Sequence, residues 1–176
     1  MELDGRFQIY TGDGKGKSTA ALGLAVRAAC AGYGVYIGQF MKGRDTSELR
    51  LPGLFDGIID IEQYGSPVMV LQGQQPGEDD VRMARDGLAL LEKAMLSGAY
   101  DIVIADEINV AQYMGLIGIQ DMVRLVDSRP ADVELVFTGR HAPEALVGMA
   151  DLVTEMREVK HYYSTEGLEA RRGIEF

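Results

Sequence analysis

The sequence predicts an α/β fold in which a mainly parallel β-sheet is flanked by helices. Short apolar segments with strand character alternate along the chain with longer segments whose apolar residues recur every three or four positions. A length of 176 residues suits one core, so we expect residues 1–176 to form a single domain. No internal repeat or low-complexity segment interrupts this alternation.

The composition disfavours several classes of protein. Basic residues number 17 against 27 acidic ones, and the net charge of -10 disfavours nucleic-acid binding as a main role. Cys30 is the only cysteine, which suits a reducing cytoplasm, and its apolar helical context predicts a small core residue. Residues 1–7 are mostly polar and no apolar run reaches ~18 residues, so we expect a cytoplasmic protein without signal peptide or membrane span.

The first forty residues predict strand, helix and strand. Phe7, Ile9 and Tyr10 form an alternating apolar run, which is typical of a strand. Nearly every residue from 20 to 31 is apolar or small, so we expect a helix over 17–31 that is buried on all sides. VYIGQF, residues 35–40, then predicts a buried strand.

The next segment is less regular. Residues 46–57 are ambiguous, and one interpretation is a short helix broken at Pro52–Gly53. IIDIEQ, residues 58–63, alternates as a strand does. Residues 64–77 carry five glycines or prolines and predict a long loop. The four apolar residues at 68–71 favour a binding loop or lid over simple surface irregularity.

The second half predicts three helices and three strands. Apolar residues recur at helical spacing over 78–97, and three acids in the first turn complement the helix dipole. The remaining elements are short. We expect strands over 102–105, 133–137 and 152–156, helices over 118–128 and 143–149, and a polar tail over 162–176.

A glycine-rich loop follows the first strand and precedes the first helix. The sequence Gly12–Thr19, GDGKGKST, has the order of a phosphate-binding loop, in which backbone N–H groups and a helix N-terminus surround a polyphosphate. Lys17 would reach the phosphates and the Ser18 hydroxyl would bind Mg²⁺. The usual pattern requires glycine at residue 11, which is Thr11, so the loop is one residue short. The alternative is a surface turn with a solvated Lys17.

Two adjacent acids follow the buried strand over 102–105. Asp106 and Glu107 lie where phosphate-loop proteins place an acid that holds Mg²⁺ directly or through water. Two carboxylates at the end of a core strand are costly to desolvate without a cation. The alternative is a solvated strand end.

Several cations are candidates for contacts with anions. Arg27 either extends to the surface from an apolar helix or points at phosphate, and helix geometry does not decide between the two. Lys42 and Arg44 follow the strand over 35–40, and Arg140 follows the strand over 133–137. Ligands bind at these carboxyl ends in open α/β sheets, although ordinary loop charges remain the alternative for Lys42 and Arg44. We find no pattern typical of a zinc site or of a serine or cysteine nucleophile.

Together these motifs resemble the phosphate-loop ATP:corrinoid adenosyltransferases, the CobA/CobO/BtuR group. The likeness covers nearly the whole chain. It includes the short loop and its helix and continues to the tail: TGDGKGKSTAALGLAVRAA, GQFMKG, DIVIADEIN, SRP, VFTGR, ADLVTEMREVKH and GIEF. The resemblance implies a P-loop NTPase-like (RecA-like) fold. It also implies transfer of the 5′-deoxyadenosyl group of ATP to a corrinoid reduced to Co(I), with release of triphosphate.

The resemblance also implies roles for individual residues. ATP would be bound by Gly12, Asp13, Gly14, Lys15, Gly16, Lys17, Ser18 and Thr19. Lys17, Arg27 and Arg140 would be the catalytic phosphate contacts, and Ser18, Asp106 and Glu107 would hold Mg²⁺. The expected partners are ATP as co-substrate, the reduced corrinoid, a flavin-dependent reductase that supplies Co(I), and a second copy of the chain in a homodimer.

The sequence departs from the family pattern at two places. Longer members carry an N-terminal arm that helps to cover the active site, whereas only six residues precede the first strand here. Some members have an aromatic pair after the glycine of the middle loop, where this chain has Ser66 and Val68 after Gly65. Two alternatives therefore stay open: a phosphate-loop ATPase, and a nucleotide-gated protein that binds or delivers corrinoids without turnover.

Overall fold

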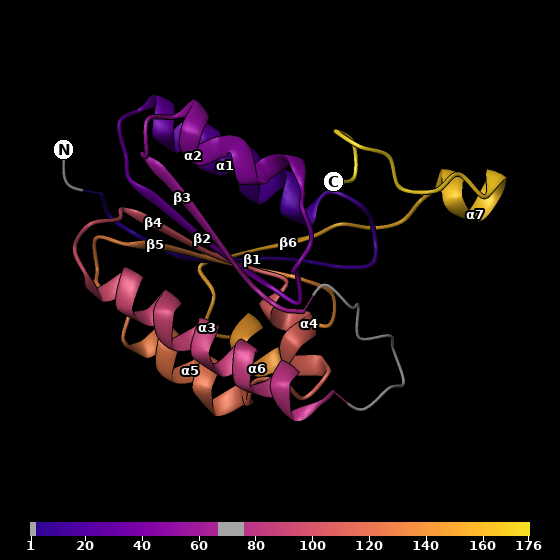
Figure 1. The fold of residues 1–176 in the computed structure, drawn as a ribbon. Coiled ribbons are helices and arrows are strands. Elements are labelled where there is room, and N and C mark those ends of the chain that lie inside the picture. The colour runs from indigo at the N-terminus through magenta and orange to yellow at the C-terminus, as the bar shows by residue number, and fades with distance from the viewer. Residues whose placement is uncertain (1–2, 67–75) are drawn as a thin grey trace.

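The chain folds around one parallel β-sheet. A computed structural model describes residues 3–66 and 76–176, and in this part of the chain six strands pair in the order β3-β2-β4-β5-β1-β6 (Figure 1). All five neighbouring pairs are parallel. The predicted α/β fold with a parallel sheet is confirmed. The strands are β1 (Phe7–Thr11), β2 (Val35–Phe40), β3 (Ile59–Tyr64), β4 (Ile102–Asp106), β5 (Glu134–Thr138) and β6 (Leu152–Glu155).

Helices cover both faces of the sheet. One face carries α1 and α2, and the other carries α3, α4, α5 and α6, whereas α7 lies away from both layers (Figure 1). The helices are α1 (Lys17–Cys30), α2 (Leu51–Leu54), α3 (Glu78–Leu96), α4 (Ile108–Tyr113), α5 (Ile119–Asp127), α6 (Glu144–Val147) and α7 (Tyr162–Glu166), with a 3-10 turn, η1, at Ser47–Arg50.

The pleat of the strands divides the core into two halves. In β4, Ile102 and Ile104 pack with the alanines of α1, whereas Val103 and Ala105 pack on the opposite face against the other helices. Successive side chains of a strand point to opposite faces, so a strand covered on both sides is apolar throughout. This burial explains the unbroken apolar run of β4.

Helix α1 is less buried than the sequence predicted. Its inner face, which includes Ala21, Ala25 and Ala28, is buried against the sheet, whereas the outer face is open to solvent. Cys30 is exposed at the end of the helix, so its assignment to the core was wrong. Small residues such as alanine and glycine cost little in water, and an apolar composition therefore does not require burial on all sides.

Two other local expectations need correction. Pro52 and Gly53 lie inside α2 and do not break it, because a proline in the first turn lacks only an N–H that would have no partner within the helix. The short helices α4 and α7 were not predicted. The expected loop over 64–77 lies mostly outside the described residues, as do Val68 and the apolar group at 68–71.

Helix α3 confirms the helix predicted over 78–97. Glu78, Asp79 and Asp80 occupy its first turn, and its inner face packs through Leu91 and Met95. None of the helices in residues 3–66 and 76–176 combines the length and the apolar character needed to cross a bilayer.

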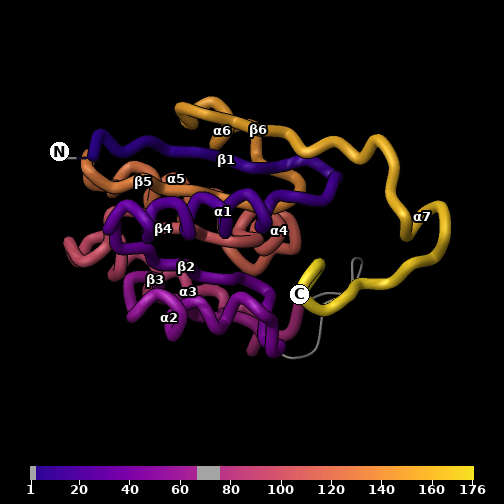
Figure 2. Tube along the Cα trace, turned by 90° about the horizontal axis from the view of Figure 1, so that it is seen from above, coloured from indigo at the N-terminus to yellow at the C-terminus, as the bar shows by residue number. Residues whose placement is uncertain are grey.

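The chain after β6 forms an extended C-terminal arm, which we define as residues 157–176. Figure 2 shows this arm leaving β6, passing beyond the carboxyl ends of the strands with α7 at its outermost point, and returning toward the β2 side of the sheet. The arm therefore runs past the same edge of the sheet where the glycine-rich loop follows β1.

A close contact beneath α3 gives a test of this packing. A Cβ atom at Gly38 would lie 2.6 Å from Cε2 of Tyr64 and 2.8 Å from Cδ1 of Leu91. We expect Gly38→Ala to lower the free energy of unfolding by roughly 1–3 kcal/mol, because the added methyl overpacks the core. Urea denaturation measures this loss.

The matched control is Gly23→Ala on α1, where a new Cβ would meet nothing within 4 Å. Alanine has the better helix propensity, so this variant should gain about 0.5–1 kcal/mol. A Gly38→Ala chain as stable as the unmodified one would contradict the packing of α3 on β2.

Candidate functional site

The strand order brings the predicted motifs to one edge of the sheet. Strands β2, β4, β5 and β1 are consecutive neighbours and run in the same direction. Their carboxyl ends therefore meet, and the glycine-rich loop after β1, the acids after β4 and the cation after β5 lie side by side. Loops at such an edge are the usual ligand-binding position in parallel α/β sheets.

The glycine-rich loop is held against the segment that follows β6. The N–H of Gly14 donates to the main-chain oxygen of Met156 at 2.7 Å. Gly12 has φ +93°, and a Cβ there would lie 2.5 Å from the same oxygen. Gly16 has φ +126° and is the N-cap residue that precedes α1. The glycines are thus required both for left-handed backbone conformations and for close packing on Met156.

The side chain of Lys17 folds back into the glycine-rich loop. Its side chain is buried, and Nζ donates to the main-chain oxygens of Gly12 at 2.7 Å and Gly14 at 2.8 Å. Burial lowers the pKa of Lys17, although Glu107 and other nearby carboxylates act in the opposite direction. The ammonium group is therefore positioned at the N-terminus of α1, where the helix dipole also favours an anion.

Asp106 is the most enclosed acid of the site. Its side chain is buried, and Oδ2 accepts from Lys42 Nζ at 2.7 Å and from Gln39 Nε2 at 3.2 Å, while Oδ1 accepts from the Thr138 hydroxyl at 2.7 Å. Burial alone would raise the pKa of Asp106, but Lys42 and the hydroxyl groups of Thr138 and Ser18 lower it below the ordinary value. Asp106 therefore stays ionised.

Lys42 is an internal counter-ion. Besides Asp106, its ammonium lies 3.5 Å from Glu48 Oε1. Burial would lower the pKa of Lys42, but Asp106 and Glu48 raise it above its usual range. The cation that desolvated acids require is therefore supplied by the chain itself. This pairing shows that Lys42 is not an ordinary loop charge, whereas its contact with a bound anion stays a prediction.

Glu107 differs from Asp106 in its backbone conformation and in the direction of its pKa shift. Its backbone is left-handed at φ +63°, and its N–H donates to the Thr138 hydroxyl at 2.9 Å. Burial, followed by repulsion from Asp106, raises the pKa of Glu107. A non-glycine residue in this conformation is strained, and such strain is concentrated at functional sites. The single Thr138 hydroxyl thus positions both acids.

The donor groups at this edge suit Mg²⁺. Ser18, Asp106 and Glu107 supply hard oxygen donors, and the Ser18 hydroxyl helps to lower the pKa of Asp106. Among residues 3–66 and 76–176, no three acidic, histidine or cysteine side chains gather into a metal cage. Mg²⁺ in nucleotide sites needs no such cage, because one or two carboxylates and the substrate phosphates hold it.

The two arginines expected at the site are placed differently. Arg140 Nη2 donates to the main-chain oxygen of Asp13 at 3.2 Å, so this cation lies beside the loop. Arg27 is exposed in the last turn of α1. Ten residues separate it from Lys17, which is about 15 Å along a helix. The structure does not bring Arg27 to the site, and we leave it out of the proposed machinery.

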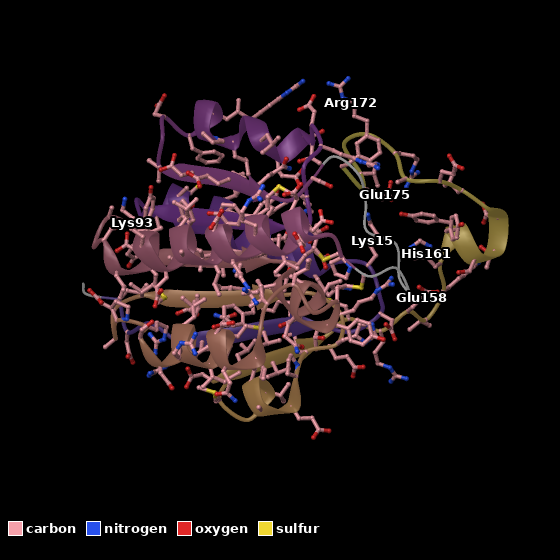
Figure 3. The ribbon with its side chains drawn as sticks, turned by 60° about the horizontal axis from the view of Figure 1, so that its bottom comes forward. Lys15, Lys93, Glu158, His161, Arg172 and Glu175 are labelled. Atoms are coloured by element: carbon pink, nitrogen blue, oxygen red, sulfur yellow. The ribbon has the colours of Figure 1, made fainter. Side chains whose placement is uncertain are left out.

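Three further loop residues face outward. The Asp13 side chain is 79% exposed, so this acid points to solvent and not toward the backbone N–H groups of the glycine-rich loop. Thr19 is exposed on the first turn of α1. The side chain of Lys15 extends from the loop toward the C-terminal arm (Figure 3).

Several residues of the site were missed from the sequence. They are Gln39, Asn109, Thr138 and Met156. Asn109 is fully buried on α4 and donates weakly to the main-chain oxygen of Gly139 at 3.3 Å, while its Oδ1 has no partner among the described residues. One signal was present: Gln39 and Thr138 are polar residues within or directly after apolar strands, next to the sheet edge that carries the motifs.

Comparison with known proteins agrees with this geometry. The model of the family ATP:corrinoid adenosyltransferase BtuR/CobO/CobP matches residues 4–176. The chain therefore belongs to this family of transferase enzymes, and the resemblance inferred from the motifs is confirmed.

Individual relatives are similar over most of the chain. A corrinoid adenosyltransferase of Sinorhizobium sp is 34% identical over 170 residues, which cover 96% of this chain and 78% of the relative. The corrinoid adenosyltransferase of Escherichia coli (strain K12) is 29% identical over 174 residues, or 96% of this chain and 84% of the relative. An uncharacterized protein of Nostoc sp. is 33% identical over 93% of this chain, which spans only 47% of that protein.

The pairing of Lys42 with Asp106 leads to a stability prediction. Lys42→Met should cost roughly 3–5 kcal/mol at pH 7, because it leaves a buried carboxylate unpaired. In the unmodified chain the pKa of Asp106 is lowered, so its stabilisation is complete above about pH 3.9 and is lost as pH falls through the folded-state pKa. In the variant, burial raises the pKa of Asp106, so the carboxylate is protonated at a higher pH. The difference between the two chains should therefore shrink as pH falls from 7 toward 4.

Urea denaturation across this pH range measures the effect. Lys93→Met on the exposed side of α3 is the control, and we expect it to change stability by about 0.5 kcal/mol or less. A loss that stays constant with pH would show that Lys42 acts through packing and not through its charge.

Proposed function

We propose that this chain transfers the 5′-deoxyadenosyl group of ATP to the Co(I) centre of a reduced corrinoid and releases triphosphate. The observation that supports this most directly is the convergence of the short glycine-rich loop, Lys17, Arg140 and the pair Asp106–Glu107 at one sheet edge. Membership of the ATP:corrinoid adenosyltransferase family supports the identity of both substrates.

The chemistry needs a stabilised leaving group more than an activated side chain. In the proposed step a Co–C bond forms at C5′ of the ribose while the C5′–O bond breaks, and triphosphate leaves with the electron pair. Co(I) is itself a strong nucleophile. The protein therefore has to align C5′ with cobalt and to stabilise negative charge on the departing oxygen.

The residues of the loop match the second task. Backbone N–H groups from Gly12 to Thr19 and the N-terminus of α1 would surround the triphosphate. Lys17 and Arg140 would add two cations, one from within the loop and one from its outer side. Because Lys17 already donates to main-chain oxygens, it is held in place before the charge on the leaving group develops.

Mg²⁺ would be held on the side of the acids. Ser18 and Glu107 would be its nearest protein ligands, while Asp106, whose oxygens already accept from Lys42 and Thr138, would orient the Ser18 hydroxyl. When bound, the ion would neutralise part of the charge of the phosphates. Among the described residues, no hydrogen bond engages the Glu107 carboxylate in the way that Lys42 and Thr138 engage Asp106, which suits a role as a metal ligand.

Other expectations depend on this assignment. Delivery of cobalt as Co(I) by a flavin-dependent reductase, assembly as a homodimer and location in the cytoplasm all stay predictions, because no contact in the structure tests them.

One experiment tests the proposed reaction. The protein is incubated with Mg-ATP and chemically reduced cob(I)alamin, in the dark and without oxygen. Formation of light-sensitive adenosylcobalamin together with inorganic triphosphate supports the transferase. ADP and orthophosphate would indicate an ATPase instead, and ligand binding without any product would indicate a binding or delivery protein.

Substitution of Lys17 tests the loop. We expect Lys17→Ala to lower the transfer rate by about 100-fold or more, because a positioned charge at the leaving group is lost. The rate is measured from the visible spectrum, and thermal denaturation shows whether the variant is folded. Lys93→Ala should transfer at the unmodified rate. Substantial activity in a folded Lys17→Ala chain would count against the assigned role.

Substitution of Glu107 tests the metal side. Glu107→Gln keeps the shape of the side chain but removes the charge, so the Mg²⁺ concentration for half-maximal activity should rise about tenfold or more. Titration of activity with Mg²⁺ at constant ATP gives this value. The control is Glu144→Gln, an exposed acid on α6, which should titrate as the unmodified chain does. Equal Mg²⁺ requirements in all three chains would remove Glu107 from the metal site.

A further inference from the structure

The C-terminal arm is organised around one carboxylate. Glu175 accepts hydrogen bonds from the Tyr162 hydroxyl, from the N–H and side chain of Arg171, and from Lys15. The guanidinium of Arg171 also stacks over the ring of Tyr162, 5.0 Å from its centroid. The bond from Tyr162, followed by those from Arg171 and Lys15, lowers the pKa of Glu175 to about 2. The group is therefore an anion at any physiological pH.

The returning end of the arm contacts the body at two places, the phosphate-binding loop and η1. Lys15 Nζ donates to the main-chain oxygen of Ile174 at 3.0 Å and to Glu175 Oε1 at 3.2 Å. The Ser47 hydroxyl donates to the main-chain oxygen of Phe176 at 3.1 Å. Figure 3 shows Lys15 and Glu175 directed toward each other across the space between loop and arm.

The position of Lys15 creates competition for its charge. Lys15 stands between Gly14 and Gly16, whose backbone would face the phosphates, and its side chain is 38% exposed. A triphosphate in the loop would bring several negative charges close to the ammonium and to the carboxylate of Glu175. The phosphates attract Lys15 and repel Glu175, so the two anions cannot both use the lysine at full strength.

We propose that the carboxylate of Glu175 and a bound polyphosphate compete for Lys15, so that occupation of the loop releases the C-terminal arm. Glu175 is then a positioning residue that acts through Lys15. This inference rests on the phosphate-binding role proposed for the loop, and it adds a conformational response to that role.

Release of the arm would change access to the neighbouring cavity. A cavity of about 360 Å³ lies between the segment that follows β2 and the end of the arm, and its walls include Met41, Lys42, Glu175 and Phe176. Glu175 and Phe176 belong to the arm, and Lys42 forms the ion pair with Asp106. Departure of the arm would open this cavity toward solvent next to the acids of the site. Binding of polyphosphate would therefore expose surface for the second substrate.

The first test compares binding of inorganic triphosphate by isothermal titration calorimetry, with Mg²⁺ present. Glu175→Gln should bind about two- to fivefold more tightly than the unmodified chain, which is the range expected for an exposed ion pair. Added salt should reduce the difference, because it screens exposed charges. The matched control is Glu169→Gln, which removes the same charge from an exposed position of the arm and should bind as the unmodified chain does.

A double substitution isolates the lysine. In a Lys15→Met background, Glu175→Gln should no longer change the affinity for triphosphate, because the shared partner has been removed. If Glu175→Gln tightened binding equally in both backgrounds, its effect would be general charge repulsion and the proposal would be wrong.

The second test follows the arm directly. The chain contains no tryptophan, so Phe176→Trp introduces a single fluorescent reporter at the end of the arm. With triphosphate and Mg²⁺ its emission should shift to longer wavelength and acrylamide should quench it more strongly. Val159→Trp is the control, because Val159 is already 93% exposed and should not respond.

The outcomes separate this inference from the function on which it rests. Failure of the unmodified chain to bind triphosphate would overturn both. Binding that is equally tight in the unmodified and Glu175→Gln chains, or an unchanged emission spectrum of the Phe176→Trp chain at saturation, would overturn only the release of the arm. Weaker binding by Glu175→Gln would do the same, since Glu175 would then hold Lys15 in place for the phosphates.

Discussion

The site depends on how one buried carboxylate is neutralised. Asp106 is only 2% exposed and ionised, and a charge in such a position is tolerated only when it is paired and hydrogen-bonded. Lys42 reaches it from the end of β2, and Thr138 reaches it from the end of β5. These contacts join the carboxyl ends of three neighbouring strands. The same Thr138 hydroxyl holds the backbone of Glu107, so the position of the second acid follows from the first.

Much of the fold could be predicted from local sequence patterns. Strands such as β4 and helices such as α3 have periodic apolar residues, and burial of these residues determines where they lie. The failures also have physical causes. Helix α4 has six residues and begins after the left-handed Glu107, so it is too short for periodicity to reveal. Apart from Arg27, the exposed residues of α1 are small and are compatible with both solvent and core, which is why Cys30 was misplaced.

The candidate site was predictable where its functional residues lie close together in the sequence. The loop from Gly12 to Thr19 and the pair Asp106–Glu107 each carry their signal within a few residues. Contacts between distant segments carry no such signal. The pairing of Lys42 with Asp106 and the contact of Lys15 with Glu175 depend on which loops meet at the sheet edge. Arg27 is the opposite case. Its residue type suggested a contact with phosphate, but its position in the last turn of α1 places it far from the loop.

The packing of the glycine-rich loop on Met156 has a consequence for how the protein is made. The loop follows the first strand, but that strand lies between β5 and β6, and Gly14 packs on Met156. During synthesis the motif leaves the ribosome well before Met156, the residue that supports it. A nascent chain therefore carries the complete motif long before it has Met156, on which the loop packs. Pairing of the first strand must also wait for distant partners. A ligand of this loop could stabilise only chains that have been translated beyond Met156.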